Sequence, residues 1–110
     1  MAGDPRPAAI IREASLASGP SGFVDAGATL TFDEAVKRRA AGSDVVVCGD
    51  NLAENRRLAA SLEASVGQAS RPQPPHKGSA GPRALPHFHQ RSRVPPGHTF
   101  YETPNLRARK

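Results

Sequence analysis

The chain has 110 residues, of which 37% are hydrophobic, with a formal net charge of +5 and a single cysteine. This length allows one small domain and leaves little apolar material for a large core. A single cysteine excludes an internal disulfide. The sequence has no basic stretch followed by a long apolar run, as a secretory signal would, and no apolar run long enough to cross a membrane. We therefore expect one small domain with no signal peptide and no membrane partner.

The charge is unevenly distributed along the chain. Residues 1–70 contain seven Lys or Arg against nine Asp or Glu, a net charge of −2, whereas residues 71–110 contain eight Lys or Arg against Glu102 alone, a net charge of +7. The second segment also holds all four histidines and eight of the eleven prolines. A basic segment favours a polyanionic partner, first of all a nucleic acid, although a solvated tail that only keeps the chain soluble has the same composition.

The N-terminal part predicts a flexible lead-in followed by a helix. In residues 1–22, prolines and glycines surround one short apolar pair, Ile10-Ile11, so we expect a linker there and a single domain over residues 23–110. Thr31 and Glu34 have the spacing of a capping box, and Gly42 supplies a left-handed stop. These residues predict a helix over 32–41.

The middle of the chain predicts a strand and a second helix. The run Val45-Val46-Val47-Cys48 is β-branched without polar alternation, which indicates a strand over 44–48 that is covered on both faces, with Cys48 as a buried structural thiol. Asp50 or Asn51 caps a helix over 51–66, and Gly67 ends it. The apolar stripe of this helix consists of Leu52, Leu58, Ala59, Leu62 and Val66. A proline-rich connection over 68–84 follows.

Residues 85–103 predict a basic hairpin whose loop is formed by residues 94–97. In this register Arg93 faces His98, Arg91 faces Phe100 and His89 faces Glu102. Side chains alternate between the two faces of a strand. Phe88 and Tyr101 therefore point toward the core, and the opposite face collects His87, His89, Arg91, Arg93, His98, Phe100 and Glu102.

Such a face has the groups that RNA cleavage requires. Transfer of the phosphate to the 2′-hydroxyl needs a base that titrates near neutral pH, an acid for the leaving 5′-oxygen, and cations for the charge on phosphorus. His87 or His89 together with His98 can serve as the acid/base pair, and Glu102 can orient a histidine or act as the base. Phosphate and RNA would be held by Arg91, Arg93 and Tyr101.

A metal site is the alternative chemistry for the same residues. His76, His87, His89 and His98 could bind zinc, because the His87-x-His89 spacing presents two imidazoles on one strand face. No cysteine cluster or nearby carboxylate completes a known zinc pattern. Surface histidines without chemistry remain the simplest interpretation of the segment.

Several motifs resemble a known group of bacterial proteins. They are the Val-rich run from Asp44 to Gly49, Asn55-Arg-Arg-Leu-Ala59, Ala84-Leu-Pro-His87-Phe-His89 and Gly97-His-Thr-Phe-Tyr-Glu102. Together they resemble the C-terminal toxin modules of bacterial polymorphic toxin systems, the exchangeable tips of Rhs- and PAAR-linked effectors. The resemblance implies a small nuclease toxin that is secreted or delivered, acts in the cytoplasm of the target cell, and is neutralised by a cognate immunity protein.

The sequence thus predicts an α+β domain in which two helices pack on a small β-sheet that ends in the histidine-bearing hairpin. The function we expect is that of a metal-independent endoribonuclease toxin that needs no cofactor and acts on RNA. The alternative is a non-catalytic basic module that binds RNA, DNA or an acidic protein.

Overall fold

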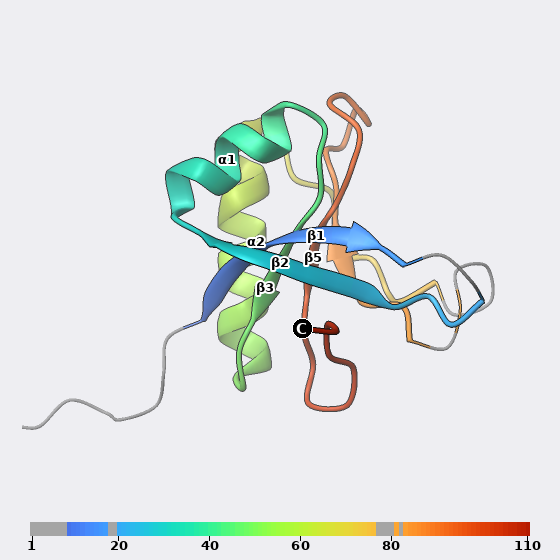
Figure 1. Ribbon diagram of the computed structural model, residues 1–110. Helices are drawn as coiled ribbons and strands as arrows, with labels where there is room; N and C mark the ends of the chain where they lie inside the picture. Colours follow the sequence, from blue (N-terminus) through green and yellow to red (C-terminus); the bar gives the residue numbers. More distant parts are fainter. Residues whose placement is uncertain (1–8, 18–19, 77–80, 82) are drawn as a thin grey trace, which may run out of the picture.

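A five-stranded mixed sheet organises the chain in the computed structural model, which describes residues 9–17, 20–76, 81 and 83–110 (Figure 1). The strands are β1 (Ile10–Leu16), β2 (Val24–Leu30), β3 (Val45–Cys48), β4 (His87–Phe88) and β5 (Thr99–Tyr101), in the order β2-β1-β3-β5-β4. Strands β3 and β5 are parallel, and the other pairs are antiparallel. With helices α1 (Phe32–Ala40) and α2 (Leu52–Val66), this confirms the expected α+β fold.

Both helices begin at the residues that the sequence indicated. Thr31 and Glu34 form the capping box of α1, and Gly42 follows the helix at φ +90°. The Asn51 side chain caps α2 by accepting a hydrogen bond from the backbone N–H of Glu54. Gly67 follows α2 in extended backbone, at φ −179°, so its role is steric: a Cβ there would lie 2.3 Å from Gln90 Oε1.

The expected lead-in is wrong for residues 10–16, which form strand β1 inside the sheet. Ile11 pairs with Leu30 of β2 on one side and with Val47 of β3 on the other. Of the seven residues of β1, Ile11 and Ala14 are buried, so the strand has little local apolar signal. Its two pairing partners come from later in the chain, and this pairing rather than the local composition makes it a strand. Residues 1–8 of the expected lead-in lie outside the described residues.

The two faces of the sheet carry separate apolar clusters. On the helix side, Ala35 of α1 with Ala59 and Leu62 of α2 packs against residues from four strands: Ile11, Val45, Val47, Phe88 and Tyr101. The other face buries Ala14, Val24, Val46, Cys48, Leu85, Phe100 and Ala108. The Val45 to Cys48 strand is therefore covered on both faces, as expected. Burial, with the Glu102 charge as a smaller cause, raises the pKa of the Cys48 thiol to about 11, so this cysteine is unreactive.

The stripe of α2 that faces the core differs from the expected one. Ala59 and Leu62 are buried, but Leu58 and Val66 are half-buried and Leu52 is exposed. The remaining buried positions of this helix are polar, Asn55 and Glu63. The buried side of α2 thus places polar groups against the chain around β4 and β5, where the histidines lie.

The C-terminal hairpin has a different register from the expected one. His87 pairs with Phe100 and Phe88 with Thr99, so the connection is longer than the four-residue loop over 94–97. The backbone groups at positions 89 and 91 bond instead to the chain after α2, at Ser70 and Gln68. The two registers have the same parity, so Phe88 and Tyr101 still point toward the helices, as expected.

None of the helices in the described ranges is both long and apolar enough to span a lipid bilayer.

Candidate active site

The structure brings the histidines of the C-terminal segment together. The ring centroid of His87 lies 4.9 Å from that of His98, 4.9 Å from that of His76 and 6.4 Å from that of His89. Phe100 adjoins two of these rings, at 5.2 Å from His98 and 5.6 Å from His87. The expected co-facial placement of His87, His98 and Phe100 is thus present although the hairpin register differs.

Asp44 orients His98, and sequence reasoning did not select it as a site residue. Its Oδ1 accepts a hydrogen bond from the backbone N–H of His98 at 2.7 Å and lies 3.4 Å from Nδ1 of the ring. The cause is the parallel pairing of β3 with β5, in which Val45 is opposite Thr99. The residues that precede the two strands, Asp44 and His98, therefore lie side by side.

The carboxyl group of Asp44 is ionised at neutral pH. Burial favours its protonated form, but the contacts with His98 and the charge of Arg39 outweigh that effect and hold the pKa of Asp44 below its usual value. An ionised carboxylate only accepts hydrogen bonds. At 3.4 Å from Oδ1, Nδ1 of His98 makes no hydrogen bond within the described residues, but the carboxylate favours the tautomer that carries the proton on Nδ1 and leaves Nε2 for chemistry.

His89 is oriented in a similar way by the backbone. Its Nδ1 lies 2.7 Å from the carbonyl oxygen of Gln90. Because a carbonyl oxygen only accepts hydrogen bonds, Nδ1 carries the proton, and in the neutral ring Nε2 is an acceptor. The His89 backbone N–H also donates to Ser70 Oγ, which fixes the residue against the segment that follows α2.

A pocket of about 390 Å³ lies between these two imidazoles. We call it the loop pocket; it is lined by His89, Arg93, Pro95, Pro96, Gly97 and His98. Arg93 has a backbone φ of 66°, the left-handed region, which costs a side-chain-bearing residue about 1 kcal/mol and is ordinarily occupied by glycine. An arginine at this strained position places a cation at a pocket that two histidines share.

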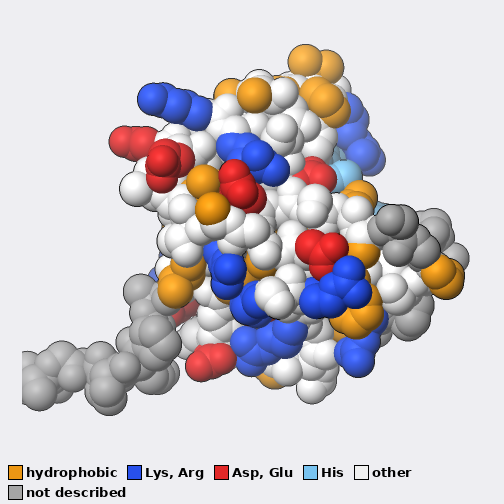
Figure 2. All heavy atoms as spheres, viewed as in Figure 1, with side chains coloured by type: hydrophobic (Ala, Val, Ile, Leu, Met, Phe, Trp, Pro, Cys, Tyr) orange, Lys and Arg blue, Asp and Glu red, His pale blue; other side chains and the backbone are white. Residues whose placement is uncertain are grey.

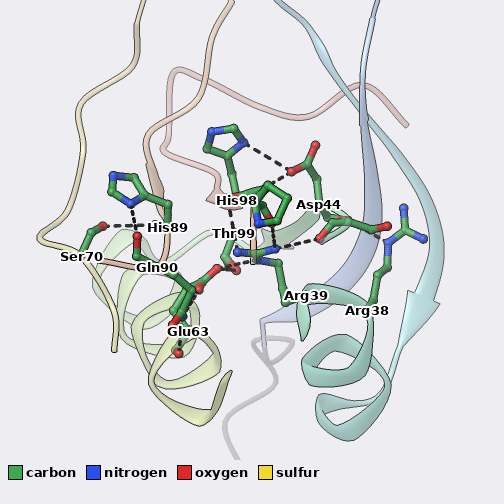
Figure 3. Close-up of polar contacts among 12 residues, drawn as sticks. Arg38, Arg39, Asp44, Glu63, Ser70, His89, Gln90, His98 and Thr99 are labelled. Atoms are coloured by element: carbon green, nitrogen blue, oxygen red, sulfur yellow. Dashed lines mark hydrogen bonds and ion pairs between the residues drawn. The ribbon is translucent and has the colours of Figure 1, made fainter. Parts of the chain in front are cut away.

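A buried ion pair holds the loop that lines this pocket (Figure 3). Arg39 of α1 and Glu63 of α2 are both fully buried, and Nε of the arginine donates to Oε1 of the carboxylate at 2.5 Å. The Arg39 guanidinium also donates to the backbone carbonyls of Pro96 and Gly97. The pair thus ties both helices to the loop that carries His98.

Glu63 completes the support on the side of His89. Its carboxylate accepts from Thr99 Oγ1 at 2.8 Å and from Gln90 Nε2 at 2.6 Å. Gln90 follows His89 and supplies the carbonyl that orients its ring. The sequence carries no local signal for this arrangement, because its members come from α1, α2, β5 and the loop after β4.

His87 is the ring that the other three histidines adjoin, and it does not line the loop pocket. It is 4% exposed, and burial, together with the neighbouring imidazoles, lowers its pKa to about 4. At neutral pH it is uncharged, and a neutral imidazole is too weak an acid to protonate a leaving group. The geometry therefore favours His89, rather than His87, as the partner of His98. His76 is exposed, and its ring lies against that of His87 at an interplanar angle of 48°.

Two of the predicted site residues, Tyr101 and Glu102, are buried and stabilise the fold instead of lining the loop pocket. Tyr101 is 4% exposed and packs on Phe88 in the core beneath the helices, and burial raises the pKa of its hydroxyl, so its ring is not available to RNA. Glu102 is buried and accepts from the backbone N–H groups of Gly49 and Ala108.

The remaining contacts of the Glu102 carboxylate are with Arg107 and Lys110, and none of its contacts within the described residues is with a histidine. It fastens the C-terminal segment to the sheet. Neither orientation of a histidine nor action as the base is consistent with that position.

The excess positive charge of the C-terminal segment is partly neutralised. Arg107 pairs with Asp50 and Glu102, and Arg109 forms a two-bonded pair with Asp25. Figure 2 shows Lys and Arg side chains interspersed with carboxylates on the face in view. Arg91 and Arg93 are exposed, and within the described part of the chain they form no ion pair.

Metal coordination receives no geometric support from the described side chains: no three His, Cys, Asp or Glu among them are placed to hold one ion. That applies to the zinc alternative through His76, His87, His89 and His98.

Comparisons with protein-family models, with curated proteins and with solved structures found no match to this chain. The function is therefore argued from the geometry of the site.

Proposed function

We propose that this domain is a metal-independent endoribonuclease whose reaction takes place in the loop pocket. The observation that carries the proposal is that two imidazoles, His89 and His98, line one pocket together with Arg93, and each has its Nδ1 turned toward an oxygen acceptor. A base, an acid and a cation are the three groups that phosphate transfer within RNA requires.

The orientation of each ring suggests its role. His89 has Nδ1 bound to the Gln90 carbonyl, so Nε2 is the atom from which it can donate a proton to the departing 5′-oxygen. His98 has Nδ1 turned toward the ionised Asp44, as the histidine of a catalytic triad does, so its Nε2 is suited to remove the proton of the 2′-hydroxyl. Arg93 is suited to balance the extra negative charge of the phosphorane.

The reaction is then an internal transfer. The 2′-oxygen forms a bond to phosphorus as His98 takes its proton, and the bond from phosphorus to the 5′-oxygen breaks as His89 protonates that oxygen. The products are a 2′,3′-cyclic phosphate and a free 5′-hydroxyl. DNA has no 2′-hydroxyl, so this route selects RNA.

The toxin setting belongs to the same proposal. The resemblance to polymorphic toxin modules would make the domain a delivered effector that cleaves RNA in the target cell and is neutralised by an immunity protein. Expression in a bacterial cytoplasm would then arrest growth.

The test is cleavage of a fluorescent RNA oligonucleotide in the presence of EDTA. His98→Ala should lower the rate at least about a hundredfold without changing the melting temperature substantially, since a general base contributes about 10²–10⁴-fold. Arg57→Ala is the control, because it removes one positive charge at a separate surface pocket beside α2. Equal rates for the wild type and His98→Ala would refute the catalytic assignment. Salt-sensitive RNA binding without cleavage would favour the basic interaction module.

A further inference from the structure

A second pocket lies on the other side of His98 and is apolar. It has a volume of about 160 Å³, and its aliphatic and aromatic lining comes from Leu16, Val24, Leu85 and Phe100. We call it the apolar pocket. It is formed by the ends of β1 and β2 and by the segments that carry β4 and β5.

Three imidazole rings form another part of its wall, beside Gly22 and Ala84. His76, His87 and His98 line the pocket, and the His87 ring lies at 48° to that of His76 and at 81° to that of His98. Because burial and the neighbouring imidazoles lower the pKa of His87 to about 4, this inner ring is neutral at physiological pH. A pocket of apolar side chains and an uncharged ring suits a flat, aromatic and uncharged group.

Among the described residues, His98 alone lines both the loop pocket and the apolar pocket. A nucleotide has the same arrangement of parts: a charged phosphate and a flat base are joined through a single ribose. With phosphate beside Arg93 and His89 and the base among Leu85 and Phe100, the ribose lies at His98. That is the position at which the proposed reaction involves its 2′-hydroxyl.

We propose that the apolar pocket binds the base of the nucleotide whose 2′-hydroxyl attacks, so that the domain cleaves RNA at unpaired nucleotides. This inference rests on the proposed nuclease function. A base that is paired and stacked within a duplex cannot enter a pocket enclosed on several sides, whereas an unpaired base can be splayed out and stacked on protein rings.

The experiment uses short oligonucleotides with a single ribose among deoxynucleotides, so that only one position can be cleaved. One substrate carries its base at that ribose, and the other is abasic there. Stacking of a base on aromatic side chains is worth about tenfold to a hundredfold in affinity. We expect kcat/KM to fall by that factor for the abasic substrate, and cleavage to cease when the first substrate is annealed to its complement.

A protein variant tests the pocket from the other side. Leu16 is 57% exposed at the rim, so Leu16→Trp can narrow the pocket without disturbing the core, and it should reduce cleavage of the substrate that carries the base while leaving the abasic one unaffected. Ile10→Trp is the matched control, because Ile10 is an exposed residue of the same strand that does not line the pocket. Equal cleavage of both substrates by the wild type and by Leu16→Trp would overturn the inference and leave the nuclease intact.

Failure of the nuclease is recognised separately, by binding. Adenosine 3′-monophosphate and ribose 3-phosphate are titrated into the protein while methyl resonances of Leu16 and Leu85 are followed by NMR. Shifts caused by the nucleotide alone, with the Leu85 shift abolished in Leu16→Trp, would support the base pocket even if no RNA is cleaved. Methyl resonances that do not respond to the nucleotide would overturn it.

Discussion

Removing the charge of Glu63 should destabilise the domain severely. Glu63 and Arg39 are fully buried, and the Glu63→Gln variant leaves the guanidinium without a counter-charge in the interior. Breaking a buried ion pair from one side costs about 3–5 kcal/mol. A domain of this size has a total stability of about 5–15 kcal/mol, so we expect the melting temperature to fall by about 10–20 °C.

The assay is urea unfolding followed by circular dichroism, with Glu54→Gln as the matched control. Glu54 is an exposed glutamate in the first turn of the same helix, so its substitution makes the same change of charge without burial. The double variant Arg39→Met/Glu63→Leu should recover most of the loss, because both buried charges are gone. A loss below about 1 kcal/mol in Glu63→Gln, as an exposed ion pair would give, would show that the pair is not a desolvated support of the loop.

Two further predictions concern the site. The pKa of His87 is lowered from 6.5 to about 4 in the folded protein, so the unfolded chain takes up its proton first as the pH falls. Stability from this group is therefore complete above pH 6.5 and is lost between pH 6.5 and 4, by at most about 3 kcal/mol; urea midpoints should show that His87→Leu lacks this dependence, and an unchanged dependence would contradict the assignment. Arg93→Gly should relieve the left-handed backbone strain and leave stability unchanged or raise it by up to about 1 kcal/mol, while RNA cleavage falls at least about tenfold. A glycine variant that is clearly less stable, or fully active, would show that the strain does not serve phosphate binding.

Local patterns in the sequence predicted the elements whose signals lie within a few residues. The capping box of Thr31 and Glu34, the stop at Gly42 and the Val run of β3 depend on neighbours in the chain, and the structure agrees with each. Alternation along the strands likewise placed Phe88 and Tyr101 toward the helices. Strand β1 was missed because its few buried residues indicate a strand only once β2 and β3 pair with it.

The composition of the C-terminal segment by itself determined that any acid/base chemistry lies among its histidines, since all four are there. Which of them could act was decided by tertiary structure. The parallel pairing of β3 with β5 places Asp44 beside His98, and packing buries His87 and turns it into a neutral ring. The buried Arg39–Glu63 pair joins helices that are distant in the sequence to the loop over 96–97. Burial and long-range pairing set orientation and protonation, and neither is a property of a residue and its neighbours in the chain.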